Sequence, residues 1–172
     1  FASTSKITFA GAGVSFLHSS PENMSNFEKL MGVTTIGADK VNQLRTIKFI
    51  PDMESMHIHM QRHREILAPK FDIVLSHLTN DLGHDFGEWT TPKGGYFVSL
   101  IVHKGLAKQV VELAGMCGVK LTSAGAPFPY GTDPDDSNIR IAPSFPPEQE
   151  LEQAMEVLTN CVKLATVRQL LS

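Results

Sequence analysis

A single lysine, Lys6, lies among hydroxyl-bearing residues near the start of the sequence, and the small residues 11–13 follow it. A lysine amine forms a Schiff base with a carbonyl group when its charged form is disfavoured. The hydroxyls of Ser3, Thr4 and Ser5 can donate hydrogen bonds to an anion, and small residues let backbone N–H groups approach one closely. The segment therefore favours a carbonyl-bearing phosphate ester as the ligand of Lys6. Taken alone, the same composition is also typical of a solvated surface turn.

A second candidate is Arg140, in the segment NIRIAP. On a strand, Asn138 and Arg140 point to one face, while Ile139 and Ile141 point to the other. A guanidinium fixed on a strand suits bidentate recognition of a carboxylate. A surface salt bridge is the alternative interpretation.

Two other polar clusters are weaker candidates. His57, His59 and His63 suggest a metal site, because the last two lie four residues apart on a predicted helix, but no third ligand has a clear spacing. The acidic segment 131–138 lacks the ligand spacing of a calcium loop, so we interpret it as a turn-rich loop. The sequence predicts no metal site.

The composition sets limits on the class of protein. The chain has 172 residues, of which 42% are hydrophobic and 19% charged, as in a globular protein. A net charge of -3 gives no electrostatic basis for binding nucleic acid, and no apolar run is long enough to span a membrane. Cys117 and Cys161 lack metal-ligand spacing, and we predict that both are reduced, buried thiols of a cytoplasmic protein.

Hydrophobic periodicity predicts the elements that carry these residues. We expect a strand over 13–20, a helix capped by Ser20 and stopped by Gly32, and a helix beginning near Asp39. A long helix should follow from Asp52 to about Asp81, in which Pro69 causes a kink or breaks a backbone hydrogen bond. Beyond it we expect strands within 87–102, a helix over 104–118, strands over 119–125 and 137–143, and a helix over 147–171. The predicted organisation is a domain tail (1–50), a connecting helix (51–82) and a small α+β domain (83–172).

Several of these segments, taken in order, resemble one known superfamily. STSK resembles the lysine segment of fold-type I pyridoxal-phosphate enzymes, the aspartate aminotransferase superfamily, and PKGGYFVSL, AGAPF and NIRIAPSFP resemble three of its later motifs. With KVNQLR and HREILAPKF, the whole chain is similar to a bacterial class I-type subgroup. The resemblance implies an α/β fold of the pyridoxal-phosphate transferase type, with the tail of the large domain followed by the small domain.

The resemblance also implies roles for individual residues. Lys6 would hold pyridoxal 5'-phosphate as a Schiff base and then move a proton at the substrate Cα. Ser3, with Ser5 as a weaker second donor, would bind the cofactor phosphate, and Arg140 would bind the substrate α-carboxylate. The superfamily usually has a phosphate-binding arginine seven or eight residues after the lysine, where this chain has residues 13–14. Either backbone N–H groups or a basic residue from elsewhere would compensate.

Lys40 and Arg45 lie in a region that approaches the partner subunit's active site in related enzymes. Either could bind a substrate side-chain carboxylate, although a solvated helix face is the alternative. Asn42 and Gln43 share these two interpretations. Tyr130 could hydrogen-bond near the ligand of Arg140, or it could be a turn aromatic that covers the core.

Together these features predict the C-terminal part of a cytoplasmic, homodimeric aminotransferase that moves an amino group between L-aspartate and 2-oxoglutarate. Another pyridoxal-phosphate enzyme, such as a β-lyase or a different aminotransferase, is an alternative, as is a non-catalytic effector-binding module. A Schiff-base aldolase is disfavoured because the chain shows no βα repeats. In the superfamily most of the cofactor pocket precedes the lysine, so we expect the chain alone to bind the cofactor poorly and to be inactive.

Overall fold

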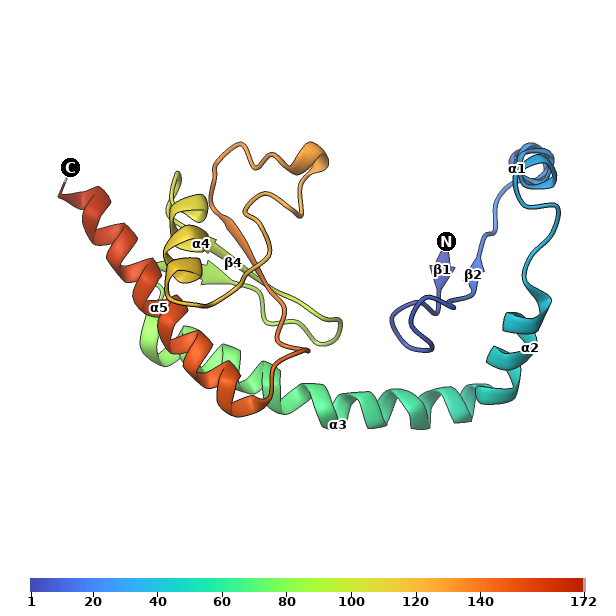
Figure 1. The fold of residues 1–172 in the computed structure, drawn as a ribbon, viewed down its shortest axis with the longest axis horizontal. Coiled ribbons are helices and arrows are strands. Elements are labelled where there is room, and N and C mark those ends of the chain that lie inside the picture. The colour runs from blue at the N-terminus through green and yellow to red at the C-terminus, as the bar shows by residue number, and fades with distance from the viewer. Residues whose placement is uncertain (172) are drawn as a thin grey trace. The chain divides into compact units, whose positions relative to one another are not determined.

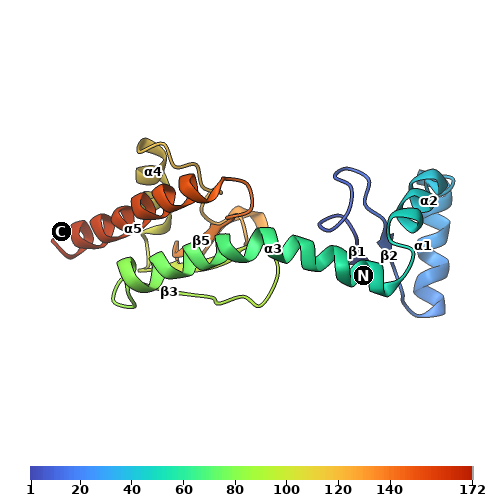
Figure 2. The same cartoon turned by 90° about the horizontal axis from the view of Figure 1, so that it is seen from below.

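The computed structural model describes residues 1–171 (Figure 1; Figure 2 gives a second view). The chain divides into two compact units, Phe1–His63 and Arg64–Ser172. The division falls within helix α3 (Met53–His77), in the stretch that the sequence assigned to a connecting helix. Each unit is described by itself below.

The first unit carries a two-stranded antiparallel ladder and two helices. Strand β1 (Ala2–Ser3) pairs with β2 (Ser15–Phe16), and helices α1 (Pro21–Thr34) and α2 (Lys40–Phe49) follow. The predicted helix starts are confirmed: the Ser20 hydroxyl accepts the N–H of Asn23, and the Asp39 carboxylate accepts that of Asn42.

Two expectations for this unit are wrong in extent. Of the strand predicted over 13–20, only Ser15–Phe16 forms a strand, because β1 has just two residues with which it can pair. Helix α1 continues through Gly32 to Thr34. The hydroxyls of Thr34 and Thr35 bond back to carbonyl oxygens of the last turn, which supports the helix beyond the glycine.

The second unit is a three-stranded antiparallel sheet with helices. Helix α3 runs uninterrupted through Pro69 and ends in a π-helical turn, η1 (Leu78–Leu82). Strands β3 (Gly87–Trp89), β4 (Val98–Val102) and β5 (Asn138–Ile141) pair in the order β3-β4-β5. Helices α4 (Ala107–Met116) and α5 (Glu148–Leu170) and a short 3-10 turn, η2 (Pro129–Gly131), complete it.

Strand alternation builds the core of this unit. In β4, Val98, Leu100 and Val102 are buried, and in β5 Ile139 and Ile141 are buried. These side chains form one cluster with buried residues of η1, α4 and α5, and α4 packs against α5 in Figure 1. The opposite alternation places Ser99 and Arg140, which are direct partners across the β4–β5 ladder, on the other face of the sheet.

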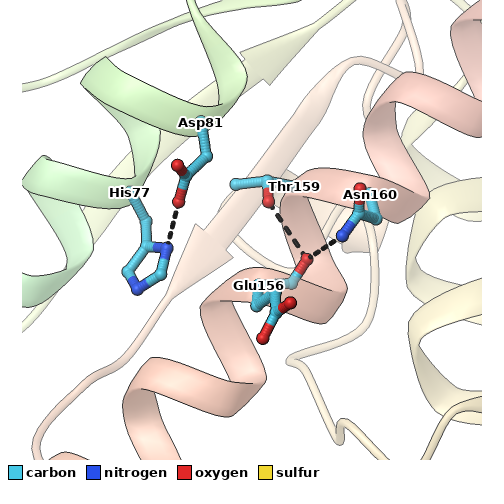
Figure 3. Close-up of polar contacts among 5 residues, drawn as sticks. All are labelled: His77, Asp81, Glu156, Thr159 and Asn160. Carbon is cyan, nitrogen blue, oxygen red and sulfur yellow. Dashed lines mark hydrogen bonds and ion pairs between the residues drawn. The ribbon is translucent and has the colours of Figure 1, made fainter.

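The junction of η1 with α5 shows how polar groups are accommodated beside this core (Figure 3). His77, the last residue of α3, pairs with Asp81, which lies one turn later in η1. On α5, the hydroxyl of Thr159 and the side-chain amide of Asn160 both donate to the carbonyl oxygen of Glu156. Thr159 is therefore buried without an unpaired hydroxyl.

Two further expectations for this unit are corrected. Residues 119–125, all of them described, form no strand. Val119 and Leu121 pack against the core by their side chains, and the segment borders a cavity of about 560 Å³ beside α5 instead of pairing with the sheet. Cys117 is also not buried: it follows the last residue of α4 and is exposed, whereas Cys161 is buried on α5.

Candidate active site

Lys6 lies on a single turn whose geometry is set by Thr4. The N–H groups of Ile7 and Thr8 both donate to the carbonyl oxygen of Thr4, at 3.0 Å each. Thr4 is buried, and its Oγ1 accepts the N–H of Val14 at 2.8 Å and the hydroxyl of Thr8 at 3.1 Å. The N–H of Thr4 donates in turn to the carbonyl oxygen of Val14 at 2.9 Å. One threonine therefore closes the loop that carries the lysine.

Three serine hydroxyls gather beside this turn. The Oγ atoms of Ser3 and Ser5 lie 2.6 Å apart, and the N–H of Ser5 donates to the Oγ of Ser3 at 3.1 Å. Ser15, opposite Ser3 in the β1–β2 ladder, brings its hydroxyl to 3.5 Å from the Oγ of Ser3. All three serines are exposed, so their hydroxyls are open to an anion. Sequence reasoning missed Ser15, because only the register of the ladder places it here.

The glycine-rich segment after Lys6 approaches this cluster closely. A Cβ atom on Gly13 would lie 2.4 Å from the Oγ of Ser5, so a side chain there would occupy the space of that hydroxyl. The N–H groups of Val14 and Ala12 are already donated, to Thr4 and to the carbonyl oxygen of Phe9. These two amides are therefore not available to replace the missing arginine, which leaves other backbone N–H groups or a basic residue from elsewhere.

Side chains of α2 and α3 hold the Lys6 loop within the first unit. The amide of Asn42 donates to the carbonyl oxygen of Ala12 at 2.8 Å, and Nε2 of His59 hydrogen-bonds the carbonyl oxygen of Ile7. The guanidinium of Arg45 lies 4.5 Å from the ring centre of Phe9. Arg45 is thus in contact with the loop of its own chain, and His59 is a hydrogen-bonding residue of that loop.

Two of the remaining candidates lie on exposed positions. Lys40, the first residue of α2, is exposed. Tyr130 is also exposed and adopts a φ of 59°, so it does not cover the core as a turn aromatic would. Within residues 1–171, no group of three or more His, Cys, Asp or Glu side chains is placed to hold a metal ion.

Arg140 is half-buried on the polar face of the sheet. Its guanidinium lies 4.5 Å from the ring centre of Phe97, a contact that sequence reasoning missed. Next to it, the amide of Asn138 donates to the hydroxyl of Ser99 at 2.7 Å. The Nε atom of Arg140 and the Oδ1 atom of Asn138 are buried and have no hydrogen-bond partner among the described residues. Buried polar atoms are costly to leave unpaired, so this face is suited to a further polar partner.

Comparison with known proteins identifies the family. The profile of the aspartate amino-transferase family matches residues 1–172. The chain belongs to the aspartate aminotransferase family. A Mycolicibacterium smegmatis protein named as an aminotransferase is 52% identical over 172 residues, which are 99% of this chain and 40% of that protein. The aspartate aminotransferase of Corynebacterium glutamicum is 47% identical over 166 residues, 96% of this chain and 38% of that protein.

Solved structures agree with the family assignment. An aspartate transaminase of Corynebacterium glutamicum superimposes with a TM-score of 0.91 at 46% identity, over 96% of this chain and 39% of that chain. An aminotransferase of Corynebacterium diphtheriae gives the same TM-score, 0.91, at 47% identity, over 96% and 41% of the two chains. The family match and these structures confirm the α/β fold inferred from the sequence motifs. The chain spans about two fifths of the length of these relatives.

Lys6, Ser3, Ser5, Lys40 and Arg45 belong to the first unit, and Arg140 belongs to the second, so the structure describes the two groups separately. Across residues 1–171, none of the helices is long and apolar enough to pass through a membrane.

Proposed function

We propose that this chain is the C-terminal part of an aminotransferase that carries pyridoxal 5'-phosphate on Lys6 and moves an amino group between L-aspartate and 2-oxoglutarate. The observation that carries this proposal is the turn that presents Lys6 beside the hydroxyls of Ser3, Ser5 and Ser15. A lysine on a turn that adjoins a cluster of exposed hydroxyls suits both the aldehyde and the phosphate of this cofactor, and the chain belongs to the aspartate aminotransferase family.

The cofactor, when bound, supplies an electron sink for the bond electrons released at the substrate Cα. In the proposed reaction Lys6 would take the proton from Cα as a general base and then, as an acid, return it to a carbon of the cofactor, which completes a 1,3-shift. Ser3, Ser5 and Ser15 would donate hydrogen bonds to the phosphate of the bound cofactor. The hydrogen bonds of Thr4 keep the lysine turn in place during both proton transfers.

Arg140 binds the α-carboxylate of the amino acid in this proposal. Its guanidinium offers two parallel N–H donors, and its position over Phe97 restricts the directions in which they point. Lys40 and Arg45 are the candidates for the side-chain carboxylate of aspartate. Arg45 lies over the ring of Phe9 in its own chain, whereas Lys40 is exposed.

The proposed donor is the one named for the corynebacterial relatives, an aspartate aminotransferase and an aspartate transaminase. A cytoplasmic homodimer is the assembly that we propose with it. A different amino-acid donor, or a β-lyase, would use the same Lys6 and Arg140, so the product distinguishes these reactions. If the chain instead belongs to an effector-binding module, that module would bind its effector and form no product.

The visible absorption spectrum of the complete polypeptide with pyridoxal 5'-phosphate tests the proposal. We expect a band of lysine-bound cofactor that L-aspartate alone converts to the amine form of the cofactor, with stoichiometric oxaloacetate. The Lys6→Ala variant should show no such band. A band that L-aspartate leaves unchanged would contradict the proposed donor, and the absence of any band in the unmutated protein would contradict the cofactor.

Replacement of Arg140 tests the carboxylate site. Arg140→Ala should raise the KM for the amino donor by roughly 10- to 100-fold, since a charge-assisted bidentate pair contributes about 1.5–3 kcal/mol. Phe97→Leu, which removes the ring below the guanidinium but leaves the charge, should have a smaller effect of about two- to fivefold. An unchanged KM in Arg140→Ala would remove this residue from its proposed role.

A further inference from the structure

Strand β5 carries Arg140 but has neighbouring backbone support on only one side. Within the described residues it pairs with β4 alone, and it is the last strand of the sheet. A short edge strand of this kind is held by few ladder hydrogen bonds. Other contacts must therefore contribute to the position of Arg140.

At its N-terminal end, β5 is held by the carboxylate of Asp133. One oxygen, Oδ2, accepts the backbone N–H groups of Ser137 and Asn138, at 2.8 Å each. The other oxygen, Oδ1, accepts the N–H of Asp135 at 3.1 Å. A single side chain thus gathers three amides of the chain that enters the strand, and charge-assisted bonds of this kind are stronger than neutral ones.

At its C-terminal end, the chain that leaves β5 is held by the ammonium of Lys70, which comes from α3. Its Nζ donates to the carbonyl oxygens of Ser144 at 3.0 Å and of Pro146 at 2.6 Å. Lys70 is partly buried, and residues 146–147 are prolines that have no N–H to offer a ladder. The ammonium therefore supplies backbone hydrogen bonds that the proline-rich turn cannot obtain from a neighbouring strand.

We propose that Asp133 and Lys70 are positioning residues for Arg140. The negative charge of Asp133 holds the amides at the start of β5, and the positive charge of Lys70 holds the carbonyl groups that follow the strand. The inference rests on the proposed function, in which Arg140 binds the substrate carboxylate. A guanidinium that forms two parallel hydrogen bonds depends strongly on the placement of its backbone, and small misplacements of binding groups cost large factors in rate. Removal of either charge should therefore affect substrate binding without any direct contact to the substrate.

The test compares Lys70→Met and Asp133→Asn with Lys104→Met in the complete polypeptide. Lys104 is a matched control, because it is an exposed lysine that pairs with Asp135 at 2.9 Å in the loop that also contains Asp133. We expect the KM for the amino donor to rise about tenfold in the first two variants, with kcat within about twofold of the parent. Amide hydrogen exchange of residues 138–141 should become faster in both, and Lys70→Arg should restore the KM. Lys104→Met should change neither quantity.

The outcomes separate this inference from the proposed function. If Arg140→Ala raises the KM but Lys70→Met and Asp133→Asn leave it at the parent value, the positioning roles are wrong and the function stands. Faster exchange in β5 without a change in KM would overturn the roles in the same way. If Arg140→Ala itself leaves the KM unchanged, the proposed carboxylate site fails, and the inference fails with it. Should Lys70→Met not fold, Asp133→Asn decides the outcome alone.

Discussion

Replacing the hydroxyl of Thr4 tests whether that one side chain closes the lysine loop. Thr4 is only 6% exposed, and its Oγ1 accepts the N–H of Val14 at 2.8 Å. Thr4→Val keeps the shape of the side chain and removes the acceptor. The N–H of Val14 then has no acceptor at that position, which should cost about 1–3 kcal/mol. The hydroxyl of Thr8 keeps its second acceptor, the carbonyl oxygen of Thr4, so the loss is mainly that of one bond.

Amide hydrogen exchange at Val14 measures this loss directly in the complete polypeptide. A cost of about 1–3 kcal/mol corresponds to exchange that is roughly 5- to 150-fold faster in Thr4→Val. The matched control is Thr8→Val, which removes a donor to Thr4 but leaves the bond between Thr4 and Val14 intact. Exchange at Val14 should change by less than about threefold in that variant. Equal exchange rates at Val14 in Thr4→Val and the parent would refute the role that we assign to Thr4.

Three further predictions concern other parts of the chain. Gly125→Ala should lower the free energy of unfolding in urea by about 1–3 kcal/mol, because φ is +83° there and a Cβ would lie 2.4 Å from a loop carbonyl oxygen. The control Gly32→Ala, within α1, should raise the free energy of unfolding by about 0.5–1 kcal/mol. Partial burial acts to raise the pKa of Asp133, but the backbone N–H groups it accepts lower that pKa below the usual 3.8. Its contribution to stability is therefore present above about pH 3.8 and lost as the pH falls further, and Asp133→Asn should reduce this acid-side loss in urea unfolding between about pH 6 and pH 3. Cys117 should react with a thiol reagent on mixing, and Cys161 only on unfolding, because burial, with Cys117 beside it, raises the pKa of Cys161; two fast phases would contradict this.

The sequence predicted the helices and most strands because their signals are local. Ser20 and Asp39 are caps with side chains that bond within the next turn, and the alternation of residues 98–102 and 138–141 reads directly as strands with one buried face. The strand predicted over 119–125 is wrong because the apolar side chains of this segment pack against the core without backbone pairing to a neighbouring strand. Hydrophobic periodicity does not distinguish a segment that only packs from one that joins a sheet. Helix α1 passed its predicted stop because hydroxyls at its end support two further residues.

The candidate site was predictable only where residue type carries the chemistry. Lys6 and Arg140 stand out by type and by their motifs, whereas Ser15 lies beside Ser3 through the register of the β1–β2 ladder, and Phe97, just before β4, contacts Arg140 only in the folded chain. The buried hydroxyl of Thr4 looks in the sequence like any other threonine of a polar loop. Contacts between residues that are distant along the chain depend on the fold, and no spacing rule states them in advance.

Helices α1 and α2 have a practical consequence for work with this chain on its own. None of their residues, all of which are described, is buried, and they expose the apolar side chains Phe27, Leu30, Val33, Val41, Leu44 and Ile47. Short helices of this length are marginal in water without an apolar partner surface. A net charge of -3 provides little mutual repulsion between molecules. Preparations of the chain alone should therefore self-associate as concentration rises, and added salt should lower the concentration at which this begins, because it screens the remaining charge.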